Sequence, residues 1–285
     1  METSDILKWC TVLLFTFFLS CTDHLPPQSL RVKSITQTLP NSNGITNITE
    51  FNYDNAGRLS NLKSYQLPDS NAAVRSRTIY TYDGNNMLLA VTRNFSDLKT
   101  ESYQFGYNQA GKVNKLDYSA LADDVYKMTF QYSGNMLTGS ERKFNFSSVS
   151  YIKSVLYNFP GNNLGSVSSV TTFTKNVSSI TNSESEYTYD DQVNPFYGNF
   201  IIPAPNGPAR PSQGNFNYYT YYGGIDNFLS LSKNNIRSES IGDYQATYDY
   251  TYNGQGLPLT RVTKKKNGQN ESYIDETLEY VYETY

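Results

Sequence analysis

Pairs of acidic residues are the groups in this sequence that could perform catalysis without a metal ion or a histidine. Two carboxylates on either side of a glycosidic bond are sufficient to hydrolyse it. Three pairs are close enough in sequence to be considered: Asp123 with Asp124, Asp190 with Asp191, and Glu184 with Glu186. Each pair lies in or beside a turn signal, where an acidic side chain commonly accepts hydrogen bonds from the backbone. We therefore expect no catalytic residues, and a carboxylate-based polysaccharide-active enzyme is the second alternative.

Histidine and cysteine are nearly absent from the chain. Its single histidine is His24, and its two cysteines are Cys10 and Cys21. Nucleophilic catalysis most often relies on a histidine base, and zinc or copper sites need closely spaced His or Cys ligands. Calcium-binding and phosphate-binding loop motifs are missing as well. We expect no metal site and no cofactor.

The N-terminal residues read as a targeting segment. Trp9 to Leu19 form an apolar run that is too short to span a bilayer and suitable as the core of a secretory signal. The residues Phe18-Leu19-Ser20-Cys21 at its end resemble the lipobox of bacterial lipoproteins. That resemblance implies a signal peptide over residues 1–20, acylation of Cys21, and attachment to a membrane. Residues 21–29 then form a tether. The residues before the apolar run depart from the pattern, because they lack the usual positive charge.

The charge of the chain excludes nucleic acid as a partner. The formal net charge is −3, which provides no basic field. The one basic run, Lys264 to Lys266, precedes Asn267-Gly268, a hairpin-turn signature. We interpret that run as the solvated end of a strand.

Aromatic residues recur in triplets of the form aromatic-x-aromatic. Most triplets are followed at once by Gly, Asn or Asp, and their spacing of roughly 25–30 residues indicates stacked copies of one structural unit. Side chains alternate along a strand, so both rings of a triplet point to the same face. Each copy therefore predicts a β-hairpin with an aromatic face. The triplets are Phe51–Tyr53, Tyr80–Tyr82, Phe105–Tyr107, Phe130–Tyr132, Tyr157–Phe159, Tyr187–Tyr189, Tyr250–Tyr252 and Tyr280–Tyr282.

These hairpins predict an all-β fold. Apolar and polar residues alternate over 101–108, 125–132 and 244–253, as expected of half-buried antiparallel strands. We expect one β domain over residues 30–285, an antiparallel up-and-down meander of about 14–16 strands. A sheet of that width should curl into a barrel-like or flattened cylinder that hides its tyrosine face.

One long segment, residues 192–235, interrupts the repeats. Five prolines accumulate in it, and it is also rich in tyrosine. A loop of this length in a compact domain is usually functional or disordered. We expect it to pack on the sheet as a lid, plug or flap and to present a ligand-binding surface. The candidate binding residues are Tyr197, Tyr218, Tyr219, Tyr221 and Tyr222.

Two family resemblances follow from these motifs. The stretch Phe51 to Leu59 is similar to one unit of the YD-repeat pattern, in which Tyr-Asp, a turn Gly and Arg-Leu follow in register. The lipobox, these hairpins, the segment Tyr189 to Gly198 and the later Lys233 to Ile236 together resemble a family of uncharacterised Gram-negative cell-envelope lipoproteins. That family has a porin-like β domain. The resemblance implies a location and a fold class, and it carries no catalytic residues.

Three functions are consistent with the sequence. The leading hypothesis is a lipid-anchored, non-enzymatic envelope protein, a binding or structural module for a glycan, peptide or protein. The alternative is an integral outer-membrane β-barrel, which the strand number suits but the polar composition does not. The third is the polysaccharide-active enzyme. We expect attachment to the outer membrane, on its periplasmic or its cell-surface side.

Overall fold

The computed structural model describes residues 29–40, 42, 44–68, 76–95, 100–119, 125–146, 149–198 and 228–285. The chain divides into two compact units. The smaller contains Arg31 and the last three residues, and the larger is Val32–Tyr282. Within the smaller unit, the Arg31 guanidinium pairs with the Glu283 carboxylate at 2.7 Å. The larger unit contains the aromatic triplets and the described ends of the insertion.

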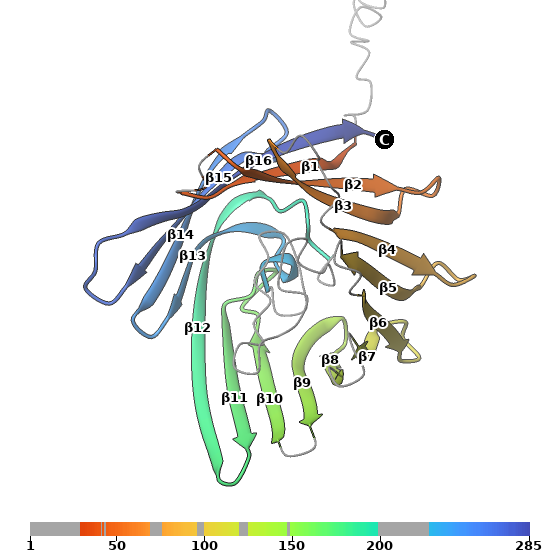
Figure 1. Cartoon of the computed structure of the whole chain (residues 1–285), viewed down its shortest axis with the longest axis vertical. Helices are drawn as coiled ribbons and strands as arrows, with labels where there is room; N and C mark the ends of the chain where they lie inside the picture. The colour runs from red at the N-terminus through yellow and green to blue at the C-terminus, as the bar shows by residue number, and fades with distance from the viewer. Residues whose placement is uncertain are drawn as a thin grey trace, which may run out of the picture. The chain divides into compact units, whose positions relative to one another are not determined.

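The described residues form sixteen strands and one short 3-10 helix (Figure 1). No helix among them is long and apolar enough to cross a membrane. The strands are β1 (Leu30–Thr38), β2 (Thr46–Tyr53), β3 (Leu59–Leu67), β4 (Ser76–Tyr82), β5 (Leu88–Phe95), β6 (Thr100–Tyr107), β7 (Val113–Ser119), β8 (Val125–Ser133), β9 (Met136–Phe146), β10 (Val149–Asn158), β11 (Ser166–Thr174), β12 (Ser178–Val193), β13 (Asn234–Ile241), β14 (Tyr244–Tyr252), β15 (Pro258–Asn267) and β16 (Tyr273–Thr284), and the helix is η1 (Phe228–Leu231).

The strands form an up-and-down meander that closes on itself. Each strand lies beside the strands before and after it in sequence, and β16 lies beside β1. The predicted antiparallel meander of about 14–16 strands is therefore confirmed, and the sheet closes as a barrel. Because the strand number is even, the chain enters and leaves the barrel at the same end. That end also carries the turns that follow the aromatic triplets.

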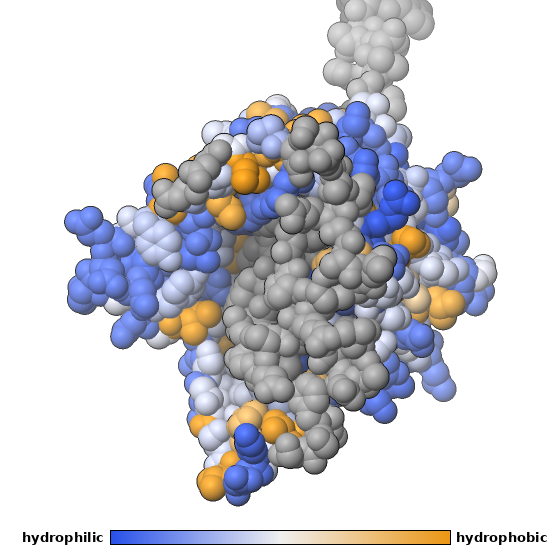
Figure 2. Space-filling model, viewed as in Figure 1, coloured by the Kyte–Doolittle hydropathy of each residue, from blue (hydrophilic) through white to orange (hydrophobic). Residues whose placement is uncertain are grey.

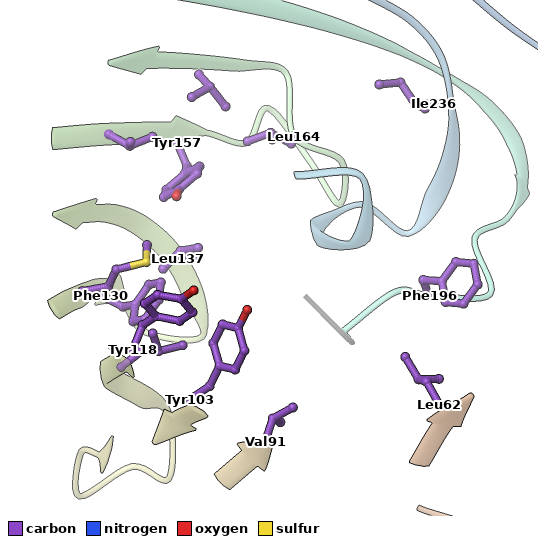
Figure 3. Close-up of a cluster of buried hydrophobic side chains, with 14 of the residues drawn as sticks. Leu62, Val91, Tyr103, Tyr118, Phe130, Leu137, Tyr157, Leu164, Phe196 and Ile236 are labelled. Atoms are coloured by element: carbon purple, nitrogen blue, oxygen red, sulfur yellow. The ribbon is translucent and has the colours of Figure 1, made fainter. Parts of the chain in front are cut away.

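The inner face of the barrel holds the aromatic rings, as the alternation predicted. Phe51, Tyr80, Phe105, Phe130 and Tyr157, the first rings of their triplets, are buried. Tyr118 stacks on Tyr126 with ring centroids 4.4 Å apart and meets Tyr103 at 5.0 Å. Figure 3 shows Tyr103 and Tyr118 pointing side by side into the interior. Burial of these rings provides the main hydrophobic driving force for closing the sheet.

The outer face of the strands is polar. On β8, for example, Lys127, Thr129 and Gln131 are exposed while the residues between them are buried. Ion pairs lie along this face, among them Lys143 with Glu141 at 2.7 Å and Lys264 with Asp249 at 2.9 Å. Figure 2 shows hydrophobic residues as separate patches on a mostly hydrophilic surface. The barrel thus has an aromatic-rich inside, which also buries charged residues, and a mostly polar outside.

Candidate functional site

Tyrosine hydroxyls join neighbouring hairpins at one end of the barrel, which we call the tyrosine rim. Each of these tyrosines is the second ring of a triplet and donates to a backbone carbonyl of the adjacent hairpin at 2.6–2.9 Å. Adjacent hairpins are not joined by a turn at this end of the barrel, so the tyrosine hydrogen bond links strands that the chain itself does not connect there. The donor–acceptor pairs are Tyr53 with Val32, Tyr82 with Leu59, Tyr107 with Leu88, Tyr132 with Val113, Tyr189 with Leu164 and Tyr282 with Pro258.

The turns at the tyrosine rim share one construction. Asp54 Oδ1 accepts hydrogen bonds from the backbone N–H groups two and four residues later. Asp83, Asn108 and Asn253 repeat this pattern in the other hairpins. The Arg58 side chain also bonds the Asp54 carboxylate and holds the pKa of that carboxyl below its usual value. These acidic and amide side chains shape the backbone, as expected of turn residues.

Two triplets depart from this pattern. Tyr157–Phe159 ends in phenylalanine, which has no hydroxyl to donate. Tyr252 donates instead to the carboxylate of Asp190. The second Asp190 oxygen accepts from the backbone N–H groups of Gln192 and Asn235. The carboxylate therefore holds the point where the long insertion leaves β12 and the chain returns as β13.

Amide side chains clamp both ends of the insertion. The Asn194 Nδ2 donates to the Ser232 carbonyl at 2.9 Å, and the Asn235 Nδ2 donates to the Val193 carbonyl at 3.0 Å. Asn163 and Asn234 bond to each other through side chain and backbone. The two ends therefore have a fixed separation and direction where they meet the barrel.

The first described residues of the insertion point into the barrel. Phe196 is buried, and its ring centroid lies 5.9 Å from that of Phe51 on β2. In Figure 3 Phe196 lies on the side of the interior that Leu62 lines. Because β2 is remote from β12 in the ring of strands, this segment crosses the interior at the tyrosine rim.

A pocket of about 680 Å³ lies at the tyrosine rim, beside the triplet that lacks a terminal hydroxyl. Its size is in the range of small-molecule sites. The described lining comes from three hairpin turns and from both ends of the insertion: Gly111, Lys112, Val113, Tyr132, Ser133, Asn135, Met136, Leu137, Phe159, Gly161, Asn162, Tyr197, Gly198, Ser230 and Leu231.

The pocket combines aromatic faces with amide groups. Tyr132 and Phe159 are half-buried, and Tyr197 is 54% exposed. Asn135 and Asn162 supply side chains that both donate and accept hydrogen bonds. Lys112 is the one charged residue of the described lining, which contains no carboxylate. This lining suits an uncharged ligand with an apolar face and several hydroxyl groups, and it offers no acid–base pair.

Charged residues also line the interior away from this pocket. Arg93 and Glu101 are fully buried, with Arg93 Nη2 2.9 Å from Glu101 Oε2. The hydroxyls of Tyr103 and Tyr118 donate to the same carboxylate at 3.0 and 3.1 Å. Burial raises the pKa of Glu101, although the neighbouring Arg93 and the two hydroxyls lower it. The carboxylate is thus occupied by three neighbours, which is the pattern of a structural ion pair.

The structure places some of the predicted site residues and not others. Tyr197 lines the pocket. Of the acidic pairs, Asp190 is bonded as described above, whereas Glu184 and Glu186 are exposed on the outer face. Within the described ranges, no group of three or more His, Cys, Asp or Glu side chains could hold a metal ion. Outside the described residues lie Cys21, Asp123, Asp124, Tyr218, Tyr219, Tyr221 and Tyr222.

Sequence reasoning missed most of the pocket. Tyr132 and Phe159 belong to triplets whose rings the alternation predicts as buried, and Asn135 and Asn162 lie in turns, where chain reversal is enough to explain an asparagine. The one available signal was Phe159, which stands where six other triplets place a hydroxyl that joins two hairpins.

Two solved structures share this fold. A porin-like protein from Bacteroides uniformis matches with a TM-score of 0.55 and 14% sequence identity, over 90% of this chain and 99% of its own. A porin-like protein from Bacteroides vulgatus matches with a TM-score of 0.52 and 12% identity, over the same shares. No protein-family model matches the sequence, and no curated protein is significantly similar to it. These likenesses establish a porin-like barrel fold.

Proposed function

We propose that this protein is a non-enzymatic envelope barrel that binds a neutral oligosaccharide segment at the tyrosine rim. The pocket between Phe159 and Tyr197 carries the proposal. Sugar rings present an apolar face that stacks on aromatic side chains, and their hydroxyls bond to amides such as Asn135 and Asn162. A lining with one lysine and no carboxylate disfavours a cationic ligand and accommodates a neutral one.

We propose further that the outer wall of the barrel faces water. A transmembrane barrel presents a lipid-facing apolar band, where Lys or Arg costs about 2–4 kcal/mol at the bilayer midplane. Here the middle of the strands carries exposed charged residues such as Lys127, Lys143 and Arg237. Lys127 even stands directly opposite Lys143 on the neighbouring strand. These charges support an outer wall that faces water, and in this proposal the barrel is attached to a membrane through an acylated Cys21.

An integral outer-membrane barrel is the second candidate. It is favoured by the sixteen strands and by the fold shared with two porin-like proteins, which support this alternative more directly than they support lipid anchoring. The two candidates differ in what surrounds the outer wall. A chain starting at Thr22 should stay in solution without detergent if that wall faces water, and it should aggregate without detergent if the wall faces lipid.

Binding can be tested with an array of neutral oligosaccharides, followed by titration calorimetry on the best ligand. Tyr197→Ala removes a ring from the pocket and should weaken binding about tenfold, equivalent to ~1.4 kcal/mol. Tyr273→Ala is the matched control, because Tyr273 is equally exposed (56%) and is not among the residues lining the pocket. Equal loss in both variants, or binding that persists in a Phe159→Ala/Tyr197→Ala variant, would contradict the proposal.

A further inference from the structure

The strand β12 is longer than its neighbour β13 and leaves an open edge. Its first seven residues, Ser178–Glu184, pair with β11. On the other side, pairing with β13 begins only at Ser185, which lies opposite Ile241. Among the described strands nothing pairs with that side of Ser178–Glu184. Figure 1 shows the β11–β12 hairpin reaching well past β13.

This edge lacks the devices that usually prevent strand pairing. Natural edges are blocked by proline, lysine, bulges or covering loops. The sequence Ser-Ser-Ile-Thr-Asn-Ser-Glu contains neither proline nor lysine, its pairing with β11 is regular, and every residue in it is exposed. Side-chain bonds from Ser178 and Ser179 go back to β11 and leave the open side clear. Alternate backbone N–H and C=O groups therefore face outward, ready to accept another strand.

An exposed apolar patch runs from β10 across this hairpin. Leu156, Val170 and Ile180 are 65%, 45% and 67% exposed. The strand register puts them on one face, since Leu156 is opposite Ser168, Val170 is opposite Asn182, and Ile180 is opposite Thr172. The patch is surrounded by serine, threonine and asparagine on an outer wall that elsewhere carries ion pairs. An open edge and an apolar patch thus coincide on one projecting element.

We propose that this edge is a self-association surface, on which two copies of the chain pair antiparallel about a two-fold axis at Thr181. In that register Thr181 meets the partner's Thr181, and Ile180 meets the partner's Asn182. Ser178 meets the partner's Glu184, so that no like charges are opposed. The two Ile180 side chains become diagonal neighbours on the same face, a position from which such side chains can still interact. The two apolar patches then merge into one.

A second copy fits this edge for reasons of symmetry. The described strands close into a ring, Ser178–Glu184 projects past β13 as an open edge, and an antiparallel pair of copies uses this edge of both chains. In the antiparallel arrangement each barrel body lies beyond the tip of the partner's hairpin, which keeps the two bodies apart. Seven residues a side make a small interface, so the dimer should be weak and should depend on concentration.

Disulfide trapping tests the register directly. The chain has two cysteines, Cys10 and Cys21, so a full-length Cys10→Ser/Cys21→Ser chain in mild detergent has no thiol. In this background Thr181→Cys places two thiols opposite each other on the axis, at a spacing that a disulfide can bridge. Thr129→Cys is the control, because Thr129 is exposed on a strand that is paired on both sides. Mild oxidation should give a covalent dimer from Thr181→Cys and at least tenfold less from Thr129→Cys.

Charge provides a second, non-covalent test. Thr181→Lys places two ammonium groups together on the axis, and sedimentation should then show a monomer where the parent chain shows a concentration-dependent dimer. Thr129→Lys should behave like the parent, and circular dichroism should be the same for all three. Equal cross-linking of the two cysteine variants, a parent chain that stays monomeric, or assemblies larger than a dimer would each overturn the proposal.

Discussion

The Tyr107 hydroxyl donates a 2.6 Å hydrogen bond to the backbone carbonyl of Leu88. The two residues end β6 and begin β5, strands whose connection lies at the far end of the barrel. The paired residues of these two strands end with Ala90 and Gln104, so this bond joins the strands beyond the end of the ladder, at the tyrosine rim. Five further tyrosines repeat the arrangement.

Removing the hydroxyl should therefore cost stability. We expect Tyr107→Phe to lower the free energy of unfolding by about 1 kcal/mol, because the partly buried Leu88 carbonyl loses its donor. Tyr80→Phe is the matched control, since the buried Tyr80 hydroxyl has no hydrogen-bond partner among the described residues. It should leave stability unchanged or raise it slightly. Urea unfolding followed by circular dichroism measures both, and similar losses in the two variants would show that ring packing, not the hydrogen bond, matters.

The buried pair of Arg93 and Glu101 should respond strongly to loss of one partner. Arg93→Met leaves an unpaired carboxylate in the interior, which should destabilise the barrel by about 3–5 kcal/mol. Glu101→Gln combined with Arg93→Met removes both charges, keeps an acceptor oxygen for one tyrosine hydroxyl, and offers an amide N–H to the oxygen of the other. We expect this double variant to recover most of the loss in urea unfolding. The single variant Glu101→Gln completes the comparison. If the losses of unfolding free energy in the two single variants added up to the loss in the double variant, the two side chains would not be coupled.

High pH should open the barrel. Burial is the main cause that raises the pKa of Tyr280, from the ordinary value of 10.0 to about 12. A raised pKa means that the folded state favours the neutral phenol, so this contribution is complete below pH 10 and is lost as the pH rises to 12. Tyrosinate absorbance and circular dichroism should therefore change together in that interval. Ionisation that precedes any loss of structure would show that the rings are accessible to hydroxide.

The proposed anchoring depends on Cys21. We expect Cys21→Ala to move the protein from the membrane fraction to the soluble fraction and to abolish labelling with a fatty-acid analogue. Cys10→Ala is the control, because Cys10 lies inside the segment that cleavage would remove. Label that persists in Cys21→Ala would refute the acylation site.

The sequence predicted the antiparallel meander, as a barrel-like or flattened cylinder, because the features that define a meander are local in the chain. Triplets such as Phe105-Gly106-Tyr107 specify a strand, a face and the turn that follows, and these suffice to define a meander. The acceptor of the Tyr107 hydroxyl lies 19 residues away, and alternation does not reveal such a partner. The alternation over 101–108 does put Glu101 on the aromatic face, but it does not reveal that its partner on the neighbouring strand is Arg93.

The pocket was predicted only through Tyr197. Its other walls are turn residues, such as Asn135 and Asn162, whose types are fully explained by chain reversal. Which turns face one another depends on how the ring closes and where the ends of the insertion enter. Neither quantity has a signature in residue spacing.

The tyrosine links at the rim have a consequence for how such a protein can change in evolution. Six of the eight triplets bring their own hydroxyl and need only a carbonyl on the neighbouring strand, so these copies do not specify how many others complete the circle. Duplication or loss of one such unit would leave every remaining junction intact. The circumference of the ring is therefore set by copy number, and the width of the interior can be altered in steps of two strands.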